Sequence, residues 1–191
     1  KQRTDGSTFF KAFSYMLDKP NRILSPAVAC NDSCFWLTDL RGNLILCNKL
    51  KATIFPPSRL GVEGYIYRML LDRDGRSVWI GYGFFHNTGT VVNFDGVTVK
   101  KRINENNGLS SDEITAIARD SSENLWFASN AGIVVLRNSK LTKYQYSDGK
   151  WFYSCNVLFV DKSGIVWAHS SDGIAMFDGS SWKLFDSVTV S

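Results

Sequence analysis

Short apolar segments alternate with short polar segments along most of the chain. Between residues 113 and 138 the apolar segments ITAIA, LWFA and GIVVL are separated by RDSSEN and SNA. Asp, Ser, Asn and Gly between short apolar segments are typical of turns that join strands. Segments that are apolar at nearly every position indicate strands covered on both faces of a sheet. The pattern therefore predicts an all-β chain of short strands.

The pattern repeats along the chain, and tryptophan marks each copy. The four tryptophans that occupy the same position in successive copies are separated by 43, 47 and 41 residues. An aspartate precedes the tryptophan by six or seven residues in three copies, and a glycine follows it by six in three copies. The repeated residues are Trp36, Trp79, Trp126, Trp167, Asp72, Asp120, Asp161, Gly42, Gly132 and Gly173.

A period of about 40 to 47 residues with four strands is typical of a β-propeller, in which four-stranded sheets called blades stack face to face. We therefore expect residues 1–191 to form a single β-propeller segment of about four antiparallel blades. The expected blades are residues 22–56, 62–103, 111–146 and 153–187, and residues 8–14 are expected to be an orphan outer strand. Since that strand is redundant, we expect a slice of a longer propeller; a four-bladed ring with a spare strand and a pairing of two chains are the alternatives.

The repeated residues have structural roles in this interpretation. Tryptophan in the second strand would fill the space between blades and bury about 150 to 250 Å². The aspartate would accept backbone N–H groups in the turn that follows it. The glycine would begin the third strand, where a tight turn often requires positive φ. We therefore assign these positions to packing and not to chemistry.

The stretch NGLSSDEITAIARDSSENLWFASNAGIVVLRN, residues 107–138, resembles the two-component regulator propeller repeat. The third copy matches this pattern best, the second and fourth less well and the first poorly. The resemblance implies a periplasmic or extracellular ligand-binding sensor of a bacterial hybrid histidine kinase, particularly of the kinases that respond to polysaccharide fragments. Related propeller modules occur in other bacterial surface and secreted proteins. The motif is specific for the architecture and says little about activity.

Charge and composition exclude several classes of function. The 22 basic and 18 acidic residues are interspersed and give a net charge of +4, whereas a nucleic-acid-binding domain usually carries a clustered basic stripe. No Cys/His spacing typical of zinc is present, and no apolar stretch approaches the roughly 20 residues that span a bilayer. We expect no metal, no cofactor, no nucleic-acid partner and no membrane contact except through segments outside this chain.

Two of the four cysteines could face each other. Cys30 and Cys34 lie on either side of a predicted hairpin, so a disulfide between them is geometrically conceivable and would suit an oxidising compartment. Two unpaired thiols are the equal alternative. The sequence leaves both open.

The loops predict a binding surface. In propellers the loops from second to third strand and from fourth to first strand share one face, and loops on a rigid scaffold often carry function. The repeat contains an insertion, GYGFFHNTG, at residues 81–89 in the first of these loop classes. Aromatic side chains beside amides and carboxylates suit a small molecule, an oligosaccharide or a peptide. The candidate ligand-binding residues are Phe85, His86, Asn87, Trp151, His169 and Asp172.

An enzyme is the alternative function. Both histidines, His86 and His169, lie in the predicted binding loops, and His169 with Asp172 could form a base and its orienting partner, as in a propeller lyase, lactonase or other hydrolase. No nucleophile motif or pair of catalytic carboxylates accompanies them. We therefore expect a ligand-binding sensor or interaction module that works with the remaining blades of a longer chain or with a second copy.

Overall fold

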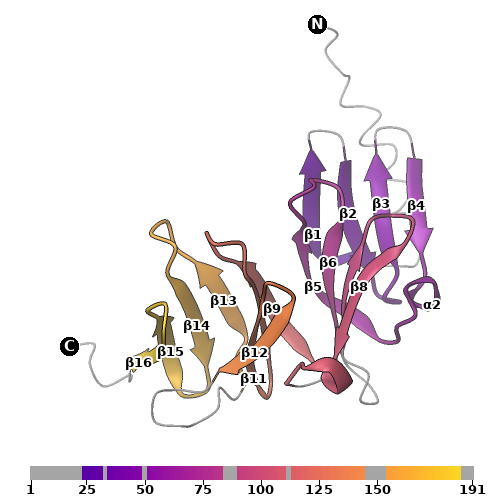
Figure 1. Cartoon of the computed structure of the whole chain (residues 1–191). Coiled ribbons are helices and arrows are strands. Elements are labelled where there is room, and N and C mark those ends of the chain that lie inside the picture. Colours follow the sequence, from indigo (N-terminus) through magenta and orange to yellow (C-terminus); the bar gives the residue numbers. More distant parts are fainter. Residues whose placement is uncertain are drawn as a thin grey trace, which may run out of the picture.

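The computed structural model describes residues 23–31, 34–48, 51–83, 90–110, 113–144 and 154–185. These residues form four antiparallel sheets of four strands each (Figure 1). The first sheet contains β1 (Ile23–Asn31), β2 (Cys34–Asp39), β3 (Leu44–Asn48) and β4 (Lys51–Phe55). The second contains β5 (Tyr65–Leu71), β6 (Val78–Gly83), β7 (Thr90–Phe94) and β8 (Val99–Asn104).

The third and fourth sheets have the same meander order. The third contains β9 (Ile114–Arg119), β10 (Leu125–Ser129), β11 (Gly132–Arg137) and β12 (Lys140–Tyr144). The fourth contains β13 (Val157–Val160), β14 (Val166–Ser170), β15 (Gly173–Phe177) and β16 (Trp182–Phe185). Helix in the described residues is limited to α2 (Pro57–Leu60) and the single 3-10 turn η1 (Glu105–Asn107).

The sheets follow one another in chain order through their first strands. β1 lies beside β5, β5 beside β9, and β9 beside β13 (Figure 1). Consecutive four-stranded meanders that stack through their first strands are the blades of a β-propeller. The predicted fold class is therefore confirmed. The expected orphan strand at residues 8–14 lies outside the described residues.

Aromatic packing between consecutive sheets forms the core. Trp36 on β2 is fully buried, with its ring 6.2 Å from that of Phe94 in the second sheet. Trp79 on β6 lies 6.1 Å from Phe127 in the third sheet. Trp126 on β10 is fully buried. Each of these tryptophans therefore contacts the sheet that follows its own.

The third interface is the richest in aromatic contacts. The ring of Trp126 lies 4.9 Å from Phe177 and 5.8 Å from Trp182, both in the fourth sheet, and 5.5 Å from Tyr144 on its own outer strand. The corresponding tryptophan of the fourth sheet, Trp167, is only partly buried. Three of the four repeated tryptophans thus lie in an interface between two described sheets, and Trp167 does not.

The repeated aspartates organise the turns between first and second strands. Asp120 accepts the backbone N–H groups of Ser122 and Asn124, and its second oxygen accepts the indole N–H of Trp126 at 2.8 Å. Asp161 makes the same indole contact with Trp167 at 2.8 Å. In these two sheets the aspartate therefore links the turn to the tryptophan of the second strand.

Asp72 departs from the expected role. Asp74, and not Asp72, accepts the backbone N–H groups of Arg76 and Ser77 in this turn. Asp72 accepts the backbone N–H of the adjacent Arg73 and a guanidinium N–H of Arg119 from the third sheet, both at 2.8 Å. The carboxylate therefore joins two sheets.

The repeated glycines lie at or before third strands, as the sequence suggested. Gly132 and Gly173 are the first residues of β11 and β15 and have φ of 135° and 128°. Gly42 lies in the turn between β2 and β3 with φ of 74°, and a Cβ there would lie 2.2 Å from the carbonyl oxygen of Gly64. The positive φ at each of these three glycines is a backbone conformation that residues with a side chain rarely adopt.

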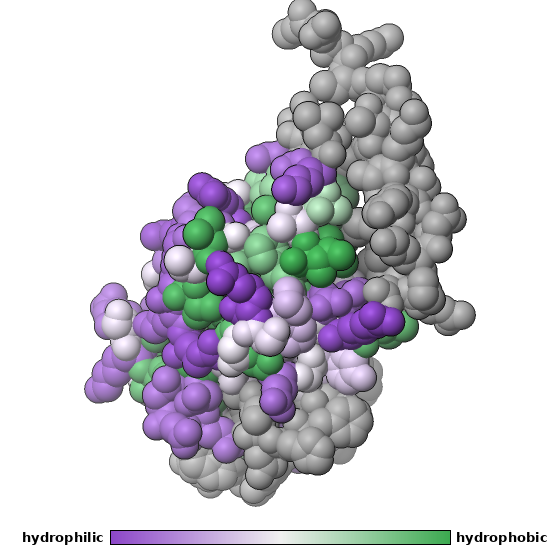
Figure 2. Space-filling model, turned by 90° about the vertical axis from the view of Figure 1, so that its right-hand side faces the viewer, coloured by the Kyte–Doolittle hydropathy of each residue, from purple (hydrophilic) through white to green (hydrophobic). Residues whose placement is uncertain are grey.

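The basic residues Lys100 and Arg102 on β8 make contacts within the protein. Lys100 pairs with Asp74 at 2.9 Å, and Arg102 donates to the carbonyl oxygens of Gly61, at 2.8 Å, and Leu60. On the side of the molecule shown in Figure 2, hydrophilic residues are spread among smaller hydrophobic areas over the described part. In the described residues, no helix is long and apolar enough to cross a membrane.

Cys30 and Cys34 face each other across the β1–β2 hairpin as thiols, with their sulfurs 2.7 Å apart. Burial, together with the neighbouring Cys34, raises the pKa of the Cys30 thiol to about 12. The reactive thiolate of Cys30 is therefore scarce at neutral pH. A disulfide would require only a small further approach, since its bond length is about 2.0 Å.

We expect mild oxidation to link Cys30 to Cys34, because no other chain movement is needed to join their sulfurs. Mass spectrometry of non-reduced peptides would then find one peptide that contains both residues and lacks two hydrogen atoms. The buried Cys155 serves as the control and should stay unmodified. Alkylation of both Cys30 and Cys34 after oxidation would contradict the expectation.

Candidate functional site

The structure describes two of the six predicted ligand-binding residues. Phe85, His86, Asn87 and Trp151 lie outside the described residues. His169 is exposed on β14, and Asp172 is exposed in the β14–β15 turn. Both positions lie at the edge of the sheet where the second strand ends.

The proposed pairing of His169 with Asp172 is not the contact found. Nδ1 of His169 lies 3.0 Å from Oδ1 of Asn156, so an amide orients the imidazole. The backbone N–H of Asp172 donates to the Ser170 hydroxyl at 3.3 Å. Among the described residues no group of three or more His, Cys, Asp or Glu side chains could hold a metal ion.

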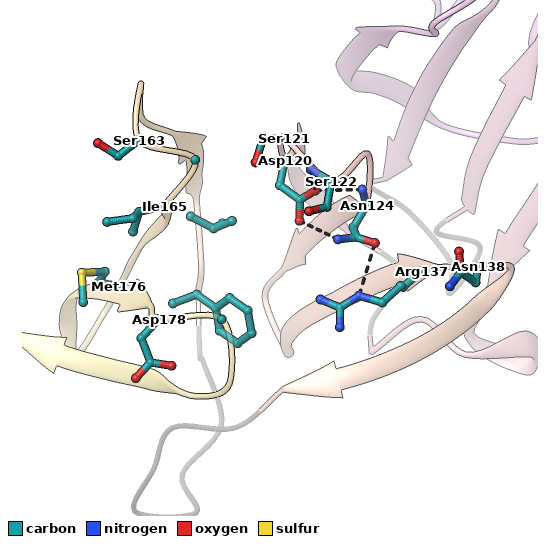
Figure 3. A pocket seen from close by; sticks show the side chains of 14 residues that line it. Asp120, Ser121, Ser122, Asn124, Arg137, Asn138, Ser163, Ile165, Met176 and Asp178 are labelled. Carbon is teal, nitrogen blue, oxygen red and sulfur yellow. Dashed lines mark hydrogen bonds between the residues drawn. The ribbon is translucent and has the colours of Figure 1, made fainter.

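A cavity of about 650 Å³ opens between the third and fourth sheets (Figure 3). It lies at the edge that carries the turns between first and second strands and between third and fourth strands, which is the edge opposite the predicted loops. Its lining includes Asp120, Asn124, Arg137, Ser163, Ile165, Met176, Phe177 and Asp178. Most of these polar side chains belong to turns, and the apolar ones to the strands that the turns join.

One wall of this inter-sheet cavity is a fixed polar network from the third sheet. The side-chain amide of Asn124 donates to Asp120 at 2.8 Å, and its carbonyl oxygen accepts Nε of Arg137 at 3.2 Å. Asp120 and Asn124 are both buried. Figure 3 shows the guanidinium group of Arg137 extending into the space between the two sheets. Asn124 therefore connects the buried carboxylate to the exposed guanidinium and sets its direction.

The opposite wall comes from the fourth sheet. Asp178 accepts the backbone N–H groups of Ser181, at 2.9 Å, and Ser180, at 3.0 Å. These hydrogen bonds hold the pKa of the Asp178 carboxyl well below its usual range, so it is ionised at neutral pH. Ile165 and Phe177 add apolar surface beside it. The cavity thus offers a cation, an anion, amide and hydroxyl groups, and an apolar strip.

Arg137 departs from the repeat, and this is the signal that sequence reasoning missed. The corresponding residue is Asp95 in the second copy and Asp178 in the fourth. Each of these aspartates accepts backbone N–H groups in the turn that leads to the outer strand. In the third copy an arginine stands there, and the turn is made by Asn138 and Ser139 with φ of 48° and 64°. A reversal of charge at a turn position is not needed for packing, so it marks a candidate functional residue.

Comparison with known proteins supports the fold and the repeat. The family model for the two component regulator propeller matches residues 108–131, which include all of β9 and β10. No curated protein matches the chain.

Several solved structures are similar. The extracellular domain of the putative hybrid two component system BT3049 from B. thetaiotaomicron is 20% identical with a TM-score of 0.69, over 87% of this chain and 23% of that one. The corresponding domain of BT4673 from the same organism is 17% identical with a TM-score of 0.64, over 86% of this chain and 24% of that one.

A third solved structure comes from a different system. PorZ of Porphyromonas gingivalis, a surface component of the type-IX secretion system, is 15% identical with a TM-score of 0.54. The match covers 82% of this chain and 25% of PorZ, so the chain spans about a quarter of the length of each of the three relatives. The chain therefore carries the two component regulator propeller repeat, which confirms the resemblance seen in its sequence, and builds it into a β-propeller.

Proposed function

We propose that this chain is part of an extracytoplasmic sensor propeller of a bacterial signalling protein and that the inter-sheet cavity binds a small polar ligand. The repeat and the extracellular domains with a similar fold support the signalling role. The observation that carries the ligand site is Arg137, whose guanidinium is directed into the cavity by Asn124.

The chemistry of the cavity favours a carbohydrate that carries a carboxylate. Arg137 can donate two parallel hydrogen bonds to a carboxylate, while Asp178 and Ser163 suit hydroxyl groups. The partly exposed Ile165 can contact the apolar face of a sugar ring. A short peptide also offers a carboxylate, but it carries a cationic amine as well, which would need an anionic or hydrogen-bond-accepting partner in the site.

The test replaces Arg137 by alanine and measures the binding of glucuronate, glucose and glycylglycine by calorimetry. We expect glucuronate to bind the original chain better than glucose, and Arg137→Ala to weaken it by about tenfold or more, because a hydrogen bond to a charged group contributes about 1.5–3 kcal/mol. Lys140→Ala is the matched control, since Lys140 is an exposed cation on the same hairpin and does not line the cavity. Equal glucuronate affinity in all three proteins would refute the site.

The loop surface with Phe85, His86, Asn87, Trp151, His169 and Asp172 stays a separate hypothesis on the opposite edge. Preference for glycylglycine with no effect of Arg137→Ala would favour that surface. A hydrolase is not proposed, since the described partner of the His169 imidazole is the amide of Asn156 and not a carboxylate.

A further inference from the structure

The outward face of the fourth sheet is exposed and largely apolar, with Lys183 and His169 as its polar members. Val157, Phe159, Ile174 and Phe185 have 45%, 51%, 50% and 47% of their surface exposed. Cross-strand pairing places them on the face that also carries Trp167 and His169. Single exposed apolar residues are normal, but a contiguous apolar patch on one sheet usually marks an interface.

This face matches the buried face of the third sheet at three positions, although Phe159 and Val157 stand where the third sheet has Ala118 and Ala116. Ile174 of β15 corresponds to Ile133 of β11, which is fully buried against the fourth sheet. The stack of Trp167 on Phe185, with ring centroids 5.9 Å apart, corresponds to the stack of Trp126 on Tyr144 at 5.5 Å. The fourth sheet is therefore built for an interface like the one that precedes it.

The hydrogen bond of the tryptophan indole is also the same in the third and fourth sheets. Asp161 holds the Trp167 N–H at 2.8 Å, as Asp120 holds that of Trp126. On the exposed face, Phe159 lies parallel to Trp167 with an interplanar angle of 7° and ring centroids 6.2 Å apart. The aromatic groups are thus already ordered before any partner covers them, which lowers the entropy cost of docking.

We propose that the outward face of β13–β16 docks a fifth blade supplied by the same polypeptide beyond residue 191. Continuity with the three observed interfaces identifies the occupant as a four-stranded sheet. At two of those interfaces the covering sheet presents a phenylalanine from the end of its third strand, Phe94 or Phe177, followed by Asp-Gly. The fifth blade should carry the same Phe-Asp-Gly or an equivalent apolar residue.

A second copy of the chain fits this face less well. A head-to-tail pair would need an open face on the first sheet, opposite the face that carries Trp36. On that face Leu37, Ile45 and Cys47 are buried, and its exposed apolar residues in the described part are Ala29, on the first strand, and Ile54, on the outer strand. In addition, the matched regions are about a quarter of the BT3049 and BT4673 domains, so those chains are long enough to supply further blades.

His169 defines one requirement for the fifth blade. It lies two residues after Trp167, where the other sheets have Thr38, Gly81 and Ala128, all buried against the next sheet. A docked blade would cover this larger polar side chain. The first strand of the fifth blade should therefore leave room for the imidazole and offer it a polar group.

The test extends the chain after Ser191 with a second copy of residues 147–191. In this copy the counterparts of Phe159, Ile174 and Phe185 are replaced by polar residues, so that the outer face of the added blade does not itself need a partner. The added copy presents the counterparts of Phe177 and Trp182 to Trp167. We expect the extended protein to be a monomer. Amide hydrogen exchange in the original β14 and β15 should be at least tenfold slower than in the unextended chain, and most of the binding of a hydrophobic dye should be lost. The matched control replaces the counterparts of Phe177 and Trp182 by serine and should show neither change.

Three outcomes would overturn the proposal. The first is unchanged exchange and dye binding in an extended protein that folds. The second is a stable dimer of the original chain in which β14 and β15 are protected, since a second copy would then be the occupant. The third is a reading frame that encodes no further blade after residue 191.

A variant of the original chain tests the face without the extension. Phe159→Ser with Phe185→Ser should leave the unfolding temperature nearly unchanged and lower dye binding severalfold, because both side chains are about half exposed. A large fall in the unfolding temperature would show that the face is already part of the core.

Discussion

Replacing Trp126 by alanine should lower the free energy of unfolding by about 3–5 kcal/mol. The side chain is fully buried and contacts Phe177 and Trp182 across the interface between the third and fourth sheets. Its removal would also leave the Asp120 carboxylate without the indole donor. Urea denaturation followed by circular dichroism would measure the change.

Trp167→Ala is the matched control for this prediction. Trp167 has the same position in its sheet and the same indole contact with its turn aspartate, but it is only partly buried. Since the hydrophobic contribution follows the apolar area removed from water, we expect a loss of ~1–2 kcal/mol. Equal losses for the two tryptophans would contradict the assignment of Trp126 to an interface and of Trp167 to an open face.

Much of the fold could be predicted from the sequence because a blade is specified locally. The spacing from Asp120 to Trp126 reflects a direct hydrogen bond between the two side chains, so the same spacing recurs wherever the same hairpin does. Likewise the glycine that follows the tryptophan meets the requirement for positive φ at the start of β11 and β15. Periodic residues report such local geometry well.

Properties that depend on neighbouring sheets could not be read in this way. The sequence treats Trp167 like the other three tryptophans, because nothing within one blade says whether another sheet covers it. Asp72 looks equivalent to Asp120, yet Asp74 competes for the same turn and leaves Asp72 to accept Arg119 from the next sheet.

The inter-sheet cavity was missed for a related reason. Its walls are turn residues from two blades, and each turn alone has an ordinary composition. Only the comparison of Arg137 with Asp95 and Asp178 in other copies separates a functional candidate from turn chemistry. Repeat alignments are therefore more informative about sites where one copy breaks the rule than where all copies obey it.

Gly81→Val should be the second large effect, with a loss of about 3 kcal/mol in the free energy of unfolding, at the upper end of the range for overpacking. Gly81 lies on β6 and faces the first strand of the third sheet. A Cβ there would lie 2.7 Å from Cγ2 and 2.9 Å from Cβ of Ile114, which is itself buried. The valine would therefore push the second and third sheets apart at β9.

A double variant separates this clash from other effects of the substitution. Ile114→Ala alone should destabilise by ~2–4 kcal/mol because it leaves a cavity. In Gly81→Val with Ile114→Ala the added methyl groups would occupy part of that cavity, so the combined loss should be smaller than the sum of the single losses by at least ~1 kcal/mol. Denaturant titrations of the four proteins would measure this coupling. Strictly additive losses would show that the side chains at positions 81 and 114 do not contact each other. That result would contradict the close approach of β6 to β9.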